Sequence, residues 1–158
     1  MLSLPQAQMA GTVAAYYSVG TEPSTRGLVY ALWKRGTYVL LPLTRPDGDL
    51  DWGSYEGPDS MIPAGHGLLE PAEAQVRHSI ASADLVIVPA LAADRRGNRL
   101  GRGRGYYDRA LAGVGSLIPT IALLYDGELL DEVPSGRLDQ PVRMAARPAA
   151  GLTRLTPA

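Results

Sequence analysis

Four short apolar runs most constrain how this chain of 158 residues can fold. They span residues 12–17, 38–43, 84–89 and 119–125, and glycine, proline or polar residues separate them. Runs of four to eight apolar residues between turn formers are typical of buried strands. Phenylalanine is absent, so leucine, valine, isoleucine, alanine and tyrosine must fill the core. We therefore expect these runs to form strands of one sheet.

A helix is predicted between the first two runs. Ser24 or Thr25 can cap it, and Gly36 ends it after two basic residues. Between these limits the apolar residues recur at helical spacing, at Leu28, Val29, Leu32 and Trp33. Strand, helix and strand within about thirty residues form a βαβ unit, which implies parallel neighbours joined by a right-handed crossover.

The rest of the chain completes a single domain, as its length predicts. Residues 44–71 are irregular, with a short edge strand expected at 50–52. Helices are expected at 72–83 and from Gly105 to Leu111, and a last short strand at 141–147. The tail, residues 148–158, is expected to fray. The predicted fold is a single three-layer α/β/α domain with a mainly parallel sheet.

Composition narrows the class of protein. The net charge is −1, which argues against a general nucleic-acid binder. Cysteine is absent, which excludes disulfides, thiolate chemistry and Cys-ligated metals and suits a reducing cytoplasm. No signal segment or membrane-spanning apolar run is apparent. We expect a cytoplasmic monomer that acts on small molecules, without nucleic-acid or membrane partners.

Residues 94–109 concentrate positive charge on a glycine-rich backbone just after the third apolar run. Six of the fifteen basic residues lie here, among four glycines. Glycines let phosphate oxygens approach main-chain N–H groups, and ligands of open α/β sheets bind beyond the carboxyl ends of strands. The spacing matches neither a P-loop nor a Rossmann turn. We interpret the stretch as a nucleotide-phosphate site; a flexible solvated turn and an RNA-binding RGG-like segment are the alternatives.

Other candidate residues are weaker. Asp108 and Asp139 could share Mg²⁺ with phosphates, or serve as a helix acid and a turn acid. His66 and His78 do not have the spacing of a zinc pair, and we expect surface or structural roles for them. Trp52 and Met61 could line an apolar pocket or fill the core.

These residues carry a family resemblance. Residues 88–94 (VPALAAD) and 97–108 (GNRLGRGRGYYD) resemble the signature of 5-formyltetrahydrofolate cyclo-ligases, also called 5,10-methenyltetrahydrofolate synthetases. Supporting matches lie at 16–25 with Glu22, at 35–36 and 41–42, at 67–71, and from Pro134 to Asp139. The resemblance covers roughly residues 11–142.

The resemblance implies a role for each matching position. The segment from Arg99 to Tyr107 would hold ATP and partly face the folate, Asp108 and Asp139 would bind Mg²⁺, and Glu22 would contact the folate. The ATP set is then Arg99, Leu100, Gly101, Arg102, Gly103, Arg104, Gly105, Tyr106 and Tyr107. The folate set is Glu22, Arg102, Tyr106, Tyr107, Trp52 and Met61, and the catalytic residues are Arg102, Arg104 and Tyr106.

The implied reaction is phosphorylation of the formyl oxygen of 5-formyltetrahydrofolate by ATP, followed by attack of N10 to give 5,10-methenyltetrahydrofolate. The protein mainly positions the phosphoryl group and neutralises its charge, for which arginines and a metal suffice. A folate- or nucleotide-binding relative without catalysis is the alternative.

Two departures from the family pattern bear on activity. Family members usually begin with a basic helix that supplies a lysine and an arginine to the phosphates, whereas no Lys or Arg precedes Arg26 here. We expect either a shortened chain or a relative that has lost full catalysis. Arg104 also stands where many members have lysine, which replaces a point charge with a planar fork.

Overall fold

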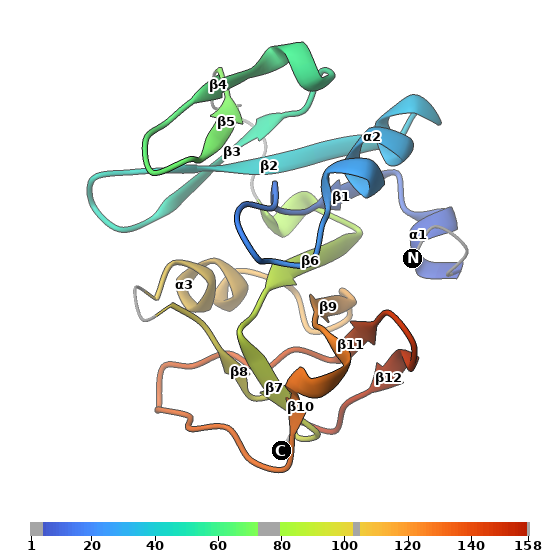
Figure 1. Cartoon of the computed structure of the whole chain (residues 1–158), viewed down its shortest axis with the longest axis vertical. Coiled ribbons are helices and arrows are strands. Elements are labelled where there is room, and N and C mark those ends of the chain that lie inside the picture. Colours follow the sequence, from blue (N-terminus) through green and yellow to red (C-terminus); the bar gives the residue numbers. More distant parts are fainter. Residues whose placement is uncertain (1–4, 73–79, 103–104, 158) are drawn as a thin grey trace.

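A seven-stranded sheet forms the centre of the computed structural model, which describes residues 5–72, 80–102 and 105–157. Its strand order is β12-β11-β9-β6-β1-β2-β3 (Figure 1). The inner strands pair in parallel, and both edge strands pair antiparallel. In chain order the strands are β1 (Thr12–Ala14), β2 (Tyr38–Thr44), β3 (Leu50–Ser54), β6 (Leu85–Pro89), β9 (Thr120–Leu123), β11 (Met144–Arg147) and β12 (Gly151–Arg154).

Alternate residues of the inner strands divide the core into two clusters, one on each face of the sheet. In β1, Val13 belongs to one cluster and Ala14 to the other. Leu85 and Ile87 of β6 lie with Val13, whereas Val86 and Val88 lie with Ala14. Because both faces are covered, these strands are apolar on both sides, which is why they read as continuous runs in the sequence.

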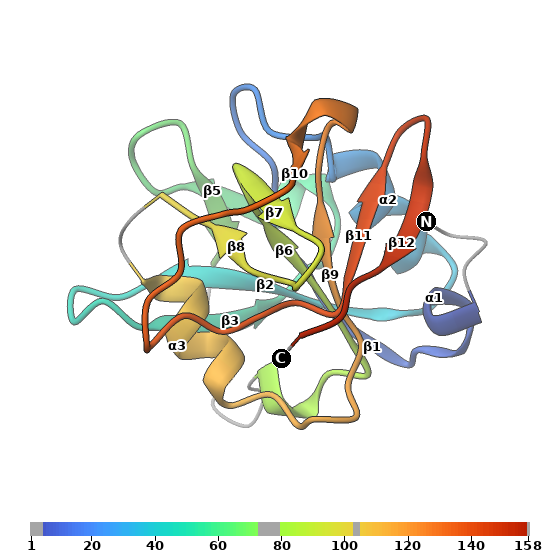
Figure 2. The ribbon, with the colours of Figure 1, turned by 90° about the horizontal axis from the view of Figure 1, so that it is seen from below.

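Few helices cover the two faces. Helices α1 (Pro5–Met9) and α2 (Arg26–Lys34) pack on the Val13 side through Ala7, Val29 and Leu32. Helix α3 (Tyr106–Ala112) packs on the other side through Leu111. Figure 2 shows α3 on the opposite side of the sheet from α2. The α/β class, the mainly parallel sheet and the helix at 26–34 are therefore confirmed. No helix among the described residues has the length and apolar character needed to cross a bilayer.

The connections place a topological switch point at the middle of the sheet. Strand β1 pairs with β2 on one side and with β6 on the other, and Val13 aligns with both Val39 and Leu85. The chain thus leaves β1 and β6 in opposite directions. Such a point opens a crevice beyond the carboxyl ends of the two strands, where ligands of open α/β folds bind.

Two small sheets lie outside the central one. One has the order β10-β7-β8, formed by Leu129–Leu130, Ala92–Asp94 and Arg99–Leu100. The other is the hairpin of β4 (Met61–Pro63) and β5 (Leu69–Pro71). The expectation that residues 44–71 are irregular apart from an edge strand is therefore wrong, since this region holds β3, the β4–β5 hairpin and a 3₁₀ turn at Pro58–Ser60.

The expectation of a frayed tail is also wrong. Strand β12 pairs with β11, and Leu155 after it is buried. The N–H groups of Ala149 and Ala150, in the turn before β12, donate to the carboxylate of Asp126. The Ala-, Thr- and Pro-rich composition hides this strand, although its partner β11 immediately precedes it in the chain.

The remaining expectations differ in detail. Strand β1 ends at Ala14, although the next residues, Ala15 and Tyr16, are buried. Of the helix expected at 72–83, residues 73–79, which include His78, lie outside the described residues, and Ile80–Ser82 forms a 3₁₀ turn. A further 3₁₀ turn spans Asp126–Glu128.

Candidate active site

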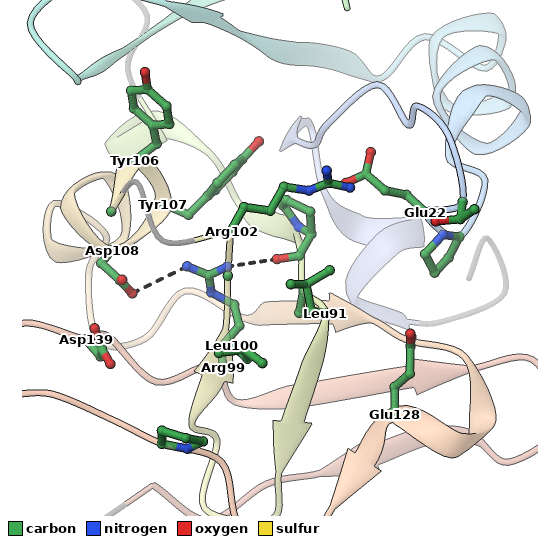
Figure 3. Close-up of a pocket in the computed structure, with 17 residues that line it drawn as sticks. Glu22, Leu91, Arg99, Leu100, Arg102, Tyr106, Tyr107, Asp108, Glu128 and Asp139 are labelled. Carbon is green, nitrogen blue, oxygen red and sulfur yellow. Dashed lines mark hydrogen bonds and ion pairs between the residues drawn. The ribbon is translucent and has the colours of Figure 1, made fainter. Parts of the chain in front are cut away.

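A cavity of about 350 Å³ lies at the switch point. The loops that follow β1 and β6 line it, through residues 21–23 and 89–91. Residues 94–109, called here the Arg/Gly stretch, contribute residues 99–102 and 105–108. The later chain contributes Glu128, Pro134 and Asp139. Segments far apart in sequence therefore converge on one pocket, as Figure 3 shows.

Gly105 lets α3 begin at the pocket. Its φ of 72° is a left-handed conformation, which glycine adopts without strain. A Cβ on Gly105 would stand 2.8 Å from Nη1 of Arg109. The turn brings Tyr106, Tyr107 and Asp108, the first three residues of α3, to the wall of the cavity.

The side chain of Arg99 connects two segments that line the pocket. Its side chain is 4 % exposed. Nη1 donates to the carbonyl of Pro89 at 2.9 Å, and Nη2 lies 3.4 Å from Oδ1 of Asp108 (Figure 3). Its guanidinium also lies 5.7 Å from the ring centroid of Tyr107. Arg99 thus holds the end of β6 to the first turn of α3.

Asp108 and Asp139 line the same cavity and come from different segments (Figure 3). Oδ1 of Asp108 accepts a hydrogen bond from the N–H of Gln140 at 3.1 Å, and Oδ2 of Asp139 accepts one from the N–H of Gly136 at 2.7 Å. No cluster of three or more metal-ligating side chains occurs within the described residues. Two carboxylates suit Mg²⁺ when substrate phosphates and water complete its shell, so the donor set fits that ion.

Glu22 and Arg102 face each other across the cavity. Glu22 lies in the loop after β1, where Oε1 accepts a hydrogen bond from the N–H of Val19 at 2.9 Å. Figure 3 shows the exposed side chain of Arg102 extending from the opposite wall toward Glu22. The lining of the pocket therefore includes a cation and an anion that point toward each other.

Two tyrosines near the pocket keep their protons. Burial, and then the charge of Glu22, raises the pKa of Tyr107, while Arg99 lowers it to a smaller extent. Tyr16, which follows β1, is 3 % exposed, and its pKa is raised by burial first and by Glu22 second. Within the described part of the chain the Tyr16 hydroxyl has no hydrogen-bond partner.

The arginines of the stretch do not act as one positive surface. Arg99 and Arg102 line the cavity, while Arg95 and Arg96 are exposed in the turn between β7 and β8. Arg109 bonds the carbonyl of Gly48, and its Nε lies 3.3 Å from Asp49, both in the β2–β3 turn. The stretch is thus a hairpin, a loop and a helix start; its second hairpin strand, the loop and the helix start line the pocket, and the hairpin turn does not.

The structure also locates the other predicted site residues. Leu100, Gly101 and Gly105 line the cavity, whereas Gly103 and Arg104 lie outside the described residues. Trp52 and Met61 do not line it. Both are buried in the core, Trp52 on the face that α3 covers and Met61 on the other. The pleat of β3 and the β4–β5 hairpin turn these side chains inward, and their role in folate binding stays a prediction.

Two kinds of lining residue were missed from the sequence. Glu128 adds a carboxylate, and Leu91 adds an apolar side chain that is 46 % exposed. Glu128 follows β9 and Leu91 follows β6, so both come just after the carboxyl end of a parallel strand. That position was the available signal, since side chains there gather at the ligand edge of the sheet.

The comparisons with known proteins identify the same family. Residues 1–148 match the model of the 5-formyltetrahydrofolate cyclo-ligase family. A protein of Mycolicibacterium smegmatis named 5-formyltetrahydrofolate cyclo-ligase is 41% identical over 150 residues, which are 91% of this chain and 77% of that protein. The protein of the same name from Escherichia coli K12 is 30% identical over 154 residues, covering 94% and 84% of the two chains.

A solved structure agrees with these relatives. The NMR structure of Aquifex aeolicus 5,10-methenyltetrahydrofolate synthetase superimposes with a TM-score of 0.82 at 27% identity, covering 99% of this chain and 78% of the other. The sequence match and the structural match therefore point to the same group of proteins. The chain belongs to the 5-formyltetrahydrofolate cyclo-ligase family.

Proposed function

We propose that the protein converts 5-formyltetrahydrofolate to 5,10-methenyltetrahydrofolate and consumes ATP with Mg²⁺. Family membership supports the folate conversion. The observation that carries the proposal for this chain is that Arg102, the Asp108–Asp139 pair and Glu22 line one cavity at the switch point. The residues that we propose to contact phosphate, Mg²⁺ and folate would then act on one bound pair of substrates.

The two substrates supply all the bonds that form and break in the proposed reaction. The formyl oxygen takes the γ-phosphoryl group of ATP, so an O–P bond forms as the bond between the β and γ phosphates breaks and ADP leaves. N10 then bonds to the formyl carbon and loses its proton to solvent. The C–O bond to phosphate breaks, and the methenyl bridge between N5 and N10 carries the positive charge.

The protein contributes positions and charges. Arg102 stabilises negative charge on the transferring phosphoryl group, and the backbone of Gly101 and Gly105 leaves room for phosphate oxygens. Asp108 and Asp139 would hold Mg²⁺, which neutralises phosphate charge when it is bound. Glu22, with Tyr106 and Tyr107, would orient the folate. The family resemblance of its sequence position implies that Arg104 would also contact phosphate.

A spectrophotometric assay tests this function. Incubation with 5-formyltetrahydrofolate, ATP and Mg²⁺ should produce the absorbance of methenyltetrahydrofolate, and omission of ATP or Mg²⁺ should abolish it. Binding of both ligands without product would favour the non-catalytic relative. If neither ligand binds, the pocket is not the substrate site and the proposal fails.

A further inference from the structure

The segment from Val133 to Gln140 brings Pro134 and Asp139 to the cavity without any helix or strand of its own. Two carboxylates hold its ends. The N–H of Val133 donates to Oδ2 of Asp94 at 3.0 Å, and the N–H of Gln140 donates to Oδ1 of Asp108 at 3.1 Å. The position of Asp139 in the pocket therefore depends on how these two ends are fixed.

Asp94 is the last residue of β7 and lies outside the cavity. It is 1 % exposed and accepts four hydrogen bonds. Its Oδ1 accepts from the N–H groups of Arg96 and Asn98, both at 3.0 Å. Its Oδ2 accepts from Nδ2 of Asn98 and from the N–H of Val133, also at 3.0 Å. One carboxylate therefore joins the β7–β8 turn to the segment that carries Asp139.

The buried Asp94 stays ionised. Burial raises its pKa, but the hydrogen bonds outweigh burial and leave the pKa below its ordinary value. Hydrogen bonds to an ionised acceptor are about twice as strong as those between neutral groups. The connection to Val133 is thus a strong one.

No second hydrogen bond between described residues holds the first end of the segment. Strand β10 ends at Leu130. After it, the first hydrogen bond between described residues that joins the segment to the rest of the protein is made by the Val133 N–H, and the next is made by the Gln140 N–H. Within the segment, Gly136 and Asp139 bond to each other, so Asp139 belongs to a small turn carried between the two ends. Without this bond, the segment would keep its hydrogen bond at Gln140 and the buried side chain of Val133, but not the polar contact that fixes its first end.

We propose that Asp94 is a positioning residue for the metal site, because its bond to Val133 holds Asp139 where it can share a cation with Asp108. This rests on the proposed function, in which those two carboxylates bind Mg²⁺. Asp94 acts through the segment and touches neither substrate nor metal. Asp94 is the first residue of the Arg/Gly stretch, but its proposed effect is on the metal site.

Asp94→Asn separates the two connections that Asp94 makes. An asparagine can place its oxygen where Oδ1 lies and keep both N–H bonds of the turn. Its NH₂ group then replaces Oδ2 and can accept neither the Val133 N–H nor Nδ2 of Asn98; the side chain of Asn98 can turn its amide over and present its oxygen to that NH₂ group. The matched control is Asp84→Asn, because Asp84 also accepts two backbone N–H groups, from Gly11 and Thr12, but lies just before β6, at the opposite end of that strand from the cavity.

The measurement is the gain in ATP affinity that Mg²⁺ provides, from calorimetric titrations with Mg²⁺ and with EDTA. We expect Asp94→Asn to reduce this gain about tenfold, because the segment loses its hydrogen bond to the Asp94 carboxylate, while the other lost bond, from Nδ2 of Asn98, lies within the β7–β8 turn. ATP affinity in EDTA should not change, and Asp84→Asn should match the wild type. A merely structural role would lower both affinities together.

The outcomes separate this inference from the proposed function. A wild-type protein whose ATP affinity is independent of Mg²⁺ would overturn the metal site itself. An equal Mg²⁺ gain in the wild type and Asp94→Asn would overturn the positioning role alone, as would an equal loss in Asp84→Asn.

Amide hydrogen exchange of the wild type provides a second measurement that needs no folded variant. The Val133 N–H should be protected to a degree similar to that of the Asn98 N–H, because one carboxylate binds both. Exchange at Val133 as fast as in an unstructured peptide would overturn the proposal.

Discussion

The two ends of the Arg/Gly stretch have similar composition and opposite environments. At the β7–β8 end, the buried carboxylate of Asp94 accepts four hydrogen bonds, and Gly97 packs against the chain at Val142. At the pocket end, Arg102 is exposed and extends across the cavity. At the first end the protein itself supplies the hydrogen-bond partners of the charged group. At the second end the charged group is available to bind a ligand. A charge-rich motif can thus be half scaffold and half binding site.

Gly97→Ala should break the scaffold end with the largest effect. Gly97 has a φ of 83°, and a Cβ there would collide with the carbonyl oxygen of Val142. The left-handed conformation costs an alanine about 1–2 kcal/mol, and the backbone collision adds to it, so we expect a loss of about 3 kcal/mol or more in unfolding free energy. Urea denaturation measures the loss. A change below about 1 kcal/mol would contradict the tight packing at this end.

Asp108→Asn should reduce turnover about 100-fold, or about 2.7 kcal/mol, because it removes a carboxylate from the charge-stabilising site. Asparagine can keep its oxygen toward Arg99 and Gln140, so the fold should persist. The rate should be measured across Mg²⁺ concentrations, with circular dichroism as the folding control. An unaltered Mg²⁺ response would remove Asp108 from the metal site.

A paired substitution tests the contrast between the two ends directly. Arg102→Ala should weaken ATP binding by about 1.5–3 kcal/mol, the value of a hydrogen bond to a charged group. Arg96→Ala removes the same charge from the β7–β8 turn, outside the cavity, and should leave ATP affinity almost unchanged. Calorimetric titration of both variants decides the matter, and equal losses would mean that only the overall charge matters.

Tyr16→Phe should have the smallest effect, and in the opposite direction. The Tyr16 hydroxyl is buried without a partner among the described residues, which is costly in the free protein. Removing it should leave stability unchanged or raise it by up to about 1 kcal/mol, as measured by thermal unfolding. A clear loss of stability would show that the hydroxyl has a partner, and a raised KM for the folate would show that the ligand provides one.

The sequence predicts the inner sheet well because its signals are local. The apolar runs and Gly36, which ends α2, depend on neighbouring residues alone. Strand β12 and the β4–β5 hairpin were missed although they pair locally, because these strands of three or four residues each contain glycine or proline, which are depleted in strands. The segments that line the pocket were indicated by the motif and its resemblance to a family.

What the sequence could not predict is the direction of individual side chains. Trp52 looked available on an irregular segment, but the pairing of β3 with β2 turns it into the core. Asp94 looked like the first acid of a loop, yet it reaches Val133, 39 residues further along the chain. Contacts of that kind follow from the register of several strands together, which no local pattern encodes.

The pocket at the switch point also bears on how the chain folds. Its walls run from Thr21 to Asp139, more than a hundred residues apart, and they meet only when most of the sheet is assembled. Such non-local contacts slow folding. The cavity therefore exists only in the native state, and a ligand that binds it stabilises the whole domain. At saturating levels this stabilisation grows with the logarithm of the ligand concentration.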